Sequence, residues 1–201
     1  MGKNFSANNI DGKRKASDFY ETPYSLTDQF LLNQPFINLC PVYTVLDPAC
    51  GSKAIGRVLC KHGYNPVEQD ISTGDDFLKY SGSKVDLIIT NPPYSLAYEF
   101  ILKAKDVSNR YIAFLLPLSY LHGKARFDNI WTDTKFPLSQ VYVFTRYPLL
   151  GETLREDGKY HTGMMVYAWF VWCKQWNGEP IIRWLDNNEY VLSSKVQSKC
   201  G

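Results

Sequence analysis

The chain has 201 residues, 45% of them apolar and 15% aromatic, and its formal net charge is +2. This length and composition are typical of one globular domain with a full core, which excludes an intrinsically disordered protein. Because the net charge is small, binding to nucleic acid would depend on a local basic patch and not on a global field.

Two further classes of protein are disfavoured. No apolar run approaches the length of a membrane span, and the first residues lack the apolar segment of a secretory signal, so we expect no membrane association. The five cysteines are odd in number and never spaced C-x-x-C, and the three histidines are scattered. This pattern argues for a reducing compartment and against a metal centre or a disulfide framework.

The first segments of the chain are a polar arm and a helix. Residues 1–17 are polar, with a basic cluster, and predict a flexible arm; contact of this arm with nucleic acid is the alternative. Thr22 is a good N-cap and Pro23 a good first helical residue, so a helix is expected over residues 24–32.

A strand, a turn of small residues and a helix come next. Residues 42–46 predict the strand, which runs into Asp47-Pro48-Ala49-Cys50-Gly51 and then into a helix that ends near Cys60. This order forms the first half of a Rossmann-like unit, in which small residues let a ligand approach the backbone. A short second strand, 66–69, ends at Asp70, whose carboxylate is placed to accept hydrogen bonds from ribose hydroxyls.

A short polar segment with one aromatic residue, residues 74–78, precedes the next strand. Asp76 can accept a hydrogen bond from a cofactor adenine amine, and Phe77 can stack on the adenine ring. The alternative is a surface turn in which Phe77 belongs to the core.

The most informative stretch is Asn91-Pro92-Pro93-Tyr94. It follows the apolar run 85–90, which predicts a buried strand, and precedes a helix that extends to about residue 106. Ligands of open α/β sheets bind at the carboxyl ends of the strands. The two prolines stiffen this turn, so Asn91 is presented on a rigid backbone.

The chemistry of this tetrapeptide suits an exocyclic amine. The amide oxygen of Asn91 and the backbone carbonyl of Pro92 are two acceptors that can hold both hydrogens of an NH2 group. Such contacts localise the nitrogen lone pair, and they strengthen toward the transition state of its attack. Tyr94 offers a flat face for stacking on an extruded base.

The second half of the chain predicts the remaining strands of a sheet. They are expected over residues 111–116, 140–144, 164–172 and 181–185. Basic and aromatic residues alternate between the first two of these strands, and they either contact a nucleic-acid backbone or form a solvated helix face; they are Lys124, Arg126, Phe127 and Trp131. The polar connection 146–162 is longer than most loops, which is typical of a functional segment.

These motifs together resemble those of S-adenosylmethionine-dependent amino-methyltransferases, in particular the DNA adenine-N6 methyltransferases. Asp47-Pro48-Ala49-Cys50-Gly51 resembles their cofactor loop and Asn91-Pro92-Pro93-Tyr94 their catalytic motif. Glu21-Thr22-Pro23 resembles the segment that closes over the cofactor in TaqI-like members, and the order of the three is the gamma arrangement. The second half resembles the small stand-alone enzymes of phages and mobile elements.

The resemblance implies a Rossmann-like class I methyltransferase fold over residues 18–185, with a polar tail at 186–201. The sheet is expected to be mostly parallel, with an antiparallel hairpin near its C-terminal end. The cofactor would be S-adenosylmethionine, and its implied contacts are Thr22, Asp47, Ala49, Gly51, Asp70, Asp76 and Phe77. The implied catalytic residues are Asn91, Pro92, Pro93 and Tyr94, acting in the cytoplasm of a bacterial or phage-infected cell.

The chain departs from the family pattern in two respects. Lys53 occupies the position of the second glycine of the cofactor loop, where a side chain could crowd the cofactor, require a different backbone angle or pair with the cofactor carboxylate. Restriction-type members carry a large separate target-recognition domain, which we do not expect in this chain, so recognition would come from loops such as 119–135 and 146–162, from a partner subunit or from a homodimer. Cytosine N4, adenine in RNA and a catalytically inactive, nucleic-acid-binding partner subunit are the alternatives to adenine N6 in DNA.

Overall fold

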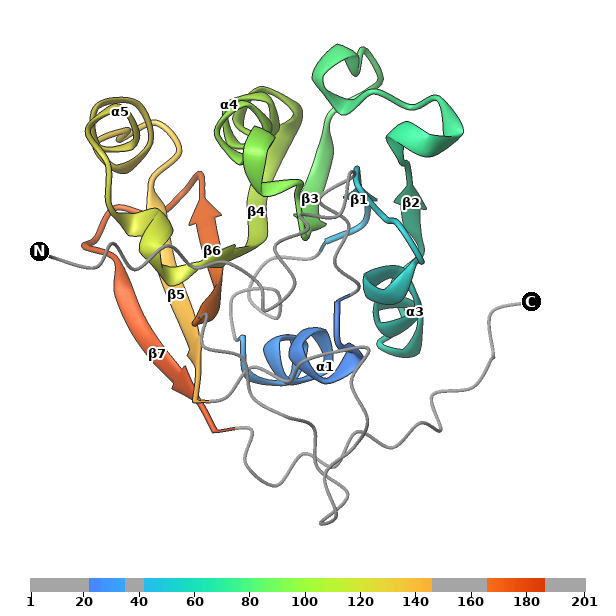
Figure 1. Ribbon diagram of the computed structural model, residues 1–201, viewed down its shortest axis with the longest axis horizontal. Helices are drawn as coiled ribbons and strands as arrows, with labels where there is room; N and C mark the ends of the chain where they lie inside the picture. Colours follow the sequence, from blue (N-terminus) through green and yellow to red (C-terminus); the bar gives the residue numbers. More distant parts are fainter. Residues whose placement is uncertain (1–21, 35–41, 146–165, 187–201) are drawn as a thin grey trace, which may run out of the picture.

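A seven-stranded sheet lies between two layers of helices (Figure 1) in the computed structural model, which describes residues 22–34, 42–145 and 166–186. The strands are β1 (Val45–Asp47), β2 (Pro66–Glu68), β3 (Val85–Thr90), β4 (Ser108–Pro117), β5 (Leu138–Phe144), β6 (Tyr167–Cys173) and β7 (Ile181–Leu185). The α-helices are α1 (Tyr24–Asn33), α3 (Ala54–Lys61), α4 (Ala97–Val107) and α5 (Lys124–Arg126), which continues into the π-helical segment η5 (Phe127–Trp131).

The strand order is β2-β1-β3-β4-β6-β5-β7. Strands β2, β1, β3 and β4 pair in parallel, whereas β6 is antiparallel to both β4 and β5, and β7 is parallel to β5. The predicted Rossmann-like α/β fold, a mostly parallel sheet with an antiparallel hairpin near its C-terminal end, is therefore confirmed.

The central strands are apolar on both faces because both faces of the sheet are covered. Along β3, Ile88 packs into a cluster with α4, while its neighbours Leu87 and Ile89 pack into a second cluster with α1 and α3. Successive side chains of a strand point to opposite faces, so these adjacent residues belong to different layers. Figure 1 shows the same division, with α4 and α5 on one side of the sheet and α1 and α3 on the other.

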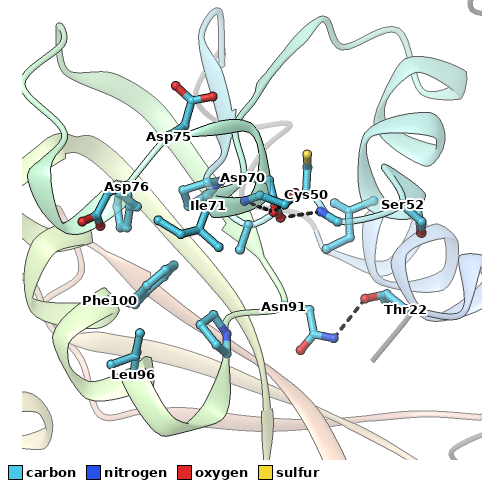
Figure 2. A pocket seen from close by; sticks show the side chains of 18 residues that line it. Thr22, Cys50, Ser52, Asp70, Ile71, Asp75, Asp76, Asn91, Leu96 and Phe100 are labelled. Atoms are coloured by element: carbon cyan, nitrogen blue, oxygen red, sulfur yellow. Dashed lines mark hydrogen bonds between the residues drawn. The ribbon is translucent and has the colours of Figure 1, made fainter. Parts of the chain in front are cut away.

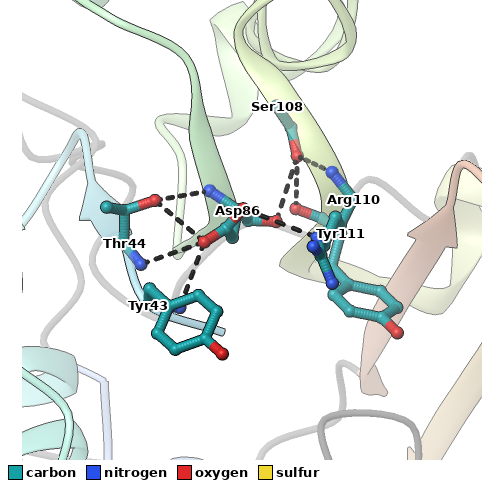
Figure 3. Close-up of polar contacts among 6 residues, drawn as sticks. All are labelled: Tyr43, Thr44, Asp86, Ser108, Arg110 and Tyr111. Carbon is teal, nitrogen blue, oxygen red and sulfur yellow. Dashed lines mark hydrogen bonds and ion pairs between the residues drawn. The ribbon is translucent and has the colours of Figure 1, made fainter. Parts of the chain in front are cut away.

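Polar contacts join β1 and β3 at their amino ends (Figure 3). The carboxylate of Asp86 accepts hydrogen bonds from the backbone N–H groups of Tyr43 and Thr44, at 3.1 and 3.2 Å, and from the hydroxyl of Thr44 at 3.2 Å. Its other oxygen lies 3.6 Å from Nε of Arg110 in β4. These contacts join three strands at the edge of the sheet opposite the carboxyl ends of β1 and β3.

The structure corrects several predicted boundaries. Helix α1 begins at Tyr24 with Pro23 as its N-cap, so the prediction that Thr22 caps the helix is wrong. The first strand is Val45–Asp47 and not 42–46. After the Asn-Pro-Pro-Tyr turn, Tyr94–Leu96 form a 3-10 turn (η3) before α4 begins, because the two prolines delay a regular α-helix.

Some expectations fall outside the described residues. They concern the arm 1–17, the connection 146–162 and the tail beyond Asp186. Within the described part of the chain, no helix has the length and apolar character needed to cross a bilayer.

We predict that Asp86→Ala lowers the free energy of unfolding by about 1–2 kcal/mol, because it removes the acceptor of two backbone N–H groups and one ion-pair contact of Arg110. Urea denaturation measures this loss. Asp106→Ala, the same replacement at an exposed position of α4, is the control and should change stability by less than about 0.5 kcal/mol. Equal effects of the two substitutions would contradict the role given to Asp86.

Candidate active site

A cavity of about 540 Å³ opens at the carboxyl ends of β1 and β3 (Figure 2). Four segments form its walls: Thr22 two residues before α1, the turn after β1 with the start of α3, the turns after β2, and the turn after β3 with the start of α4. The lining residues are Thr22, Pro48, Ala49, Cys50, Gly51, Ser52, Ala54, Ile55, Asp70, Ile71, Ser72, Asp75, Asp76, Phe77, Asn91, Pro93, Leu96 and Phe100.

The turn after β1 is held by Asp70. Gly51 has a positive φ of 49°, a conformation that favours glycine, and its N–H donates to Oδ2 of Asp70 at 2.9 Å. Oδ1 of Asp70 accepts from the N–H and the hydroxyl of Ser72, at 2.9 and 2.6 Å. Burial acts to raise the pKa of Asp70, but these hydrogen bonds outweigh it and hold the pKa below its ordinary value.

Asp47 lies beneath this turn and not in the cavity wall. Its side chain is fully buried, and Oδ1 accepts the N–H of Ala49 at 3.3 Å. Burial raises the pKa of Asp47 to about 7, because removing a carboxylate from water penalises its charged form. The structure thus gives Asp47 a supporting contact to the turn, while Ala49 and Gly51 line the cavity.

Cys50 also lines the cavity, but its chemistry is that of an unreactive thiol. Burial and the nearby carboxylates of Asp47, Glu68 and Asp70 raise its pKa to about 11. At neutral pH the side chain is a protonated thiol, which is a poor nucleophile.

Lys53 adopts a left-handed backbone conformation, with φ 64° and ψ 27°, at the N-cap of α3. Its ammonium pairs with Glu68 at 3.1 Å. Lys53 is not among the residues that line the cavity, and its side chain points to Glu68 at the end of β2. Lys53 thus keeps a backbone conformation that glycine adopts freely, and its side chain is directed to Glu68; whether it affects the cofactor stays a prediction.

Gly56 makes room for this ion pair. A Cβ atom added at Gly56 would lie 1.9 Å from Oε1 of Glu68, far inside the contact distance of two atoms. Glu68 therefore lies against the helix backbone of α3, from where it reaches Lys53.

One end of the cavity combines a carboxylate with apolar side chains. Figure 2 shows Asp76 at this end, near Ile71 and Phe100. Hydrogen bonding to Lys79 lowers the pKa of Asp76, so its carboxylate is ionised at neutral pH. Ile71 is 70% exposed although it is apolar, whereas Phe77 is buried and packs against Phe100 at a centroid distance of 5.1 Å.

The other end of the cavity holds Asn91 and Thr22. Nδ2 of Asn91 donates to Oγ1 of Thr22 at 3.1 Å, across 69 positions of the sequence. Pro93 lines the cavity next to them, whereas Pro92 is buried behind the turn. The half-buried ring of Tyr94 lies outside the cavity wall and near Tyr167, with centroids 5.7 Å apart.

The charge of the cavity wall is negative. Three carboxylates contribute to it, from Asp70, Asp75 and Asp76, and none of the described lining residues is a lysine, arginine or histidine. Such a wall repels phosphate groups and attracts a ligand with positive charge. A dinucleotide or nucleoside triphosphate is therefore a poor fit, and a cationic nucleoside derivative is a good one.

Comparisons with protein-family models and with curated proteins give no match. Solved structures do match. A protein of Listeria monocytogenes assigned to the class I S-adenosylmethionine-dependent methyltransferases aligns with TM-score 0.58 at 13% identity, over 88% of this chain and 68% of its own. Magnesium protoporphyrin IX methyltransferase of Synechocystis, with S-adenosylmethionine bound, aligns with TM-score 0.54 at 15% identity, over 76% and 79%.

A third match is the methyltransferase subunit of a type I restriction-modification system from Streptococcus thermophilus. It has TM-score 0.51 and 13% identity, over 86% of this chain and 48% of that subunit. The chain has the class I methyltransferase fold. At these identities the likeness concerns the fold alone, and proteins with this fold act on very different molecules.

Most of the residues that the resemblance implies as cofactor contacts line the cavity. Thr22, Ala49, Gly51, Asp70, Asp76 and Phe77 line it together with Asn91 and Pro93, whereas Asp47, Pro92 and Tyr94 do not. Two further residues that line the cavity, Ile71 and Phe100, were not predicted from the sequence. An isolated isoleucine in the polar turn after Asp70 was a usable signal for Ile71, but Phe100 is hidden in the ordinary apolar spacing of a helix.

We predict that Lys53→Gly is more stable than Lys53→Ala by about 1 kcal/mol. Both variants lose the ion pair with Glu68, but only glycine adopts the left-handed conformation at residue 53 without a steric penalty. Chemical denaturation of the two variants side by side measures the difference. Equal stabilities would mean that the backbone at residue 53 is not left-handed in solution.

We also predict a pH-dependent contribution of Asp47 to stability. The pKa in the folded protein, about 7, lies above the ordinary value of 3.8, so the native state binds more protons than the unfolded state between these values. The contribution of Asp47 is therefore most favourable below about pH 4 and is lost as the pH rises to about 7.

Denaturation of the wild type and of Asp47→Asn at several pH values tests this. The stability of the wild type relative to the variant should fall by about 2–4 kcal/mol between pH 4 and pH 7. A difference that does not change over this range would contradict the raised pKa.

Proposed function

We propose that the protein transfers a methyl group from S-adenosylmethionine to N6 of adenine in DNA. The observation that carries this proposal is that Asn91 and Pro93 of the Asn-Pro-Pro-Tyr turn line the acidic cavity, so the amide that would hold an amine and the walls for a cationic nucleoside belong to one space. The match to solved structures of the same fold, one of them with S-adenosylmethionine bound, supports the choice of cofactor.

The residues of the cavity suit S-adenosylmethionine along its length. Asp76 would accept from the adenine amine, and Ile71 and Phe100 would contact the faces of the ring. Asp70 would accept from the ribose; both its oxygens already accept hydrogen bonds, but a carboxylate has about four acceptor sites in all. Gly51 would leave its backbone accessible to the methionine part.

The cofactor supplies a methyl group on a positively charged sulfur, and the carboxylates of the cavity wall complement this charge. The Asn91 amide oxygen and the Pro92 carbonyl would accept both hydrogens of the target amine and localise its lone pair. These acceptors are preorganised on the turn between β3 and α4, so they need not reorganise during the reaction. A covalent enzyme intermediate is not expected, since the thiol of Cys50 stays protonated.

Features beside the Asn-Pro-Pro-Tyr motif and on the segment after β4 favour a nucleic acid as substrate. Tyr94 and Tyr167 offer neighbouring ring faces beside the motif. The segment after β4 carries the exposed apolar side chains of Leu121 and Phe127, with Lys124 above the Phe127 ring at 5.6 Å. An exposed apolar side chain flanked by positive charge suits contact with unstacked bases and phosphates.

Target recognition would come from this segment, from a partner subunit or from a second copy of the chain. The choice of DNA over RNA rests on the resemblance of the sequence motifs to those of the DNA adenine-N6 methyltransferases. Asn91 favours adenine over cytosine, because cytosine-N4 enzymes of the resembled class more often carry serine at this position. The position of Lys53 outside the cavity wall argues against an inactive partner subunit that cannot bind cofactor.

We predict that the purified protein transfers label from S-adenosylmethionine to N6 of adenine in unmethylated DNA, and that Asn91→Ala abolishes this transfer. Loss of the amide removes one of two acceptors for the amine, so the rate should fall at least about 100-fold, while cofactor affinity changes by less than about threefold. Digestion of the DNA and identification of the labelled nucleoside measure the first effect, and calorimetry measures the second.

Asn109→Ala, at an exposed position near the amino end of β4, is the matched control and should keep wild-type activity. Label in N4-methylcytosine would support the same mechanism with cytosine as the target base. Label in RNA alone would identify RNA, and not DNA, as the substrate. Cofactor binding and full activity of Asn91→Ala would refute the mechanism, and failure to bind cofactor with nucleic acid still bound would identify an inactive partner subunit.

A further inference from the structure

Strand β7 forms one edge of the sheet and carries exposed apolar side chains. Figure 1 shows it beyond β5, the one strand with which it pairs among the described residues. Trp184 is 71% exposed and Ile182 is 51% exposed. Both lie on the same face of the sheet as their neighbours Val143 and Val141 of β5, which are buried. The layer that covers β5 on this face therefore leaves β7 open.

An edge strand can pair with a further strand unless a bulge, a proline or a charged side chain prevents it. Strand β7 pairs with β5 over five successive residues without a shift in register, and it contains no proline. Its single charged residue, Arg183, is turned back toward β5, where Nε donates to Oε1 of Gln140 at 3.0 Å. Strand β7 itself therefore has none of the features that prevent pairing.

The residues of β7 suit antiparallel pairing with a second copy of the same strand. In a two-fold symmetric register centred on Arg183, Ile182 of each copy lies opposite Trp184 of the other, and Ile181 lies opposite Leu185. An aromatic ring opposite a β-branched side chain is a favourable cross-strand pair. The two Arg183 residues would meet at the symmetry axis, where like charges repel, but each guanidinium is held toward its own β5.

We propose that the chain forms a two-fold symmetric dimer in which β7 of one copy pairs antiparallel with β7 of the other. The formal net charge of the chain is only +2, so two copies repel each other weakly. A nucleic acid is a poorer partner for this edge, since Arg183 is the one basic residue of β7 and already donates to Gln140. The inference goes beyond the proposed function and does not depend on it.

The topology of the sheet fixes where the two cavities of such a dimer lie. Strands β4 and β5 are both antiparallel to β6, and β7 is parallel to β5, so β7 has the same direction as β1 and β3. Antiparallel pairing of two β7 strands therefore turns the carboxyl edges of the two sheets in opposite directions. The two cavities lie at opposite edges of one joined sheet, and each copy would meet its substrate on its own.

Analytical ultracentrifugation of the full chain under reducing conditions tests the association. A ladder of this length is small beside a standard interface of about 1,600 Å², so we expect a dissociation constant of roughly 10–100 µM. Trp184→Lys and Ile182→Lys each place a charge on the pairing edge and should weaken the dimer at least about tenfold. Tyr43→Lys is the matched control, because Tyr43 is an aromatic residue outside β7 that is 78% exposed, and it should keep the wild-type constant.

Cysteine cross-linking tests the register. The sulfurs introduced by Arg183→Cys would face each other across the axis, with Cα atoms about 4.5–5.5 Å apart, which is within the range of a disulfide. Ile181→Cys is the control, because the two copies of residue 181 would lie about 14 Å apart. Mild oxidation should join Arg183→Cys into a covalent dimer, identified by peptide mapping. Ile181→Cys should stay at the level of the wild type, which has five cysteines of its own.

The outcomes are distinct. A monomer at every concentration up to about 1 mM would overturn the inference, as would a dimer that neither lysine substitution in β7 weakens. Cross-linking of Ile181→Cys as efficient as that of Arg183→Cys would also overturn it. Circular dichroism shows whether each variant is folded, and if a lysine variant does not fold, the cross-link of Arg183→Cys decides. Absence of methyl transfer by the wild type would refute the proposed function and leave the test of the dimer unchanged.

Discussion

The carboxylate of Asp70 is the contact on which the shape of the cavity depends. It accepts from Gly51 in the turn after β1 with one oxygen and from Ser72 in the turn after β2 with the other. These turns form adjoining walls of the cavity, and neither has a regular helix or strand to hold it. Because both oxygens accept hydrogen bonds, the carboxyl stays ionised, and it adds negative charge to the wall as well as holding it in place.

The sign of the charge in the cavity limits what can enter it. Carboxylates line the interior, and none of the described lining residues is a lysine, arginine or histidine. Under the proposed function, the phosphates of a nucleic acid would be repelled by this interior. Only a neutral group, such as a single extruded base, would then pass toward Asn91.

The fold could be predicted from the sequence because its central strands are buried on both faces and are therefore apolar runs, of which β3 and β4 are examples. The Asn91 turn and the turn around Gly51 were also found, since prolines and small residues at strand ends leave a local signal. The contact from Thr22 to Asn91 could not be predicted, because it joins residues 69 positions apart and depends on how α1 packs. Phe100 was missed for a similar reason: its apolar spacing is the same whether it faces a core or a cavity.

The arrangement of Lys53, Gly56 and Glu68 links three positions of this loop. Lysine at residue 53 holds a backbone angle that glycine would adopt freely, and it is paired there with a carboxylate that lies where a side chain of residue 56 would be. The three positions therefore depend on one another. A side chain at residue 56 would displace the end of Glu68, and the ammonium of Lys53 would then lose this partner.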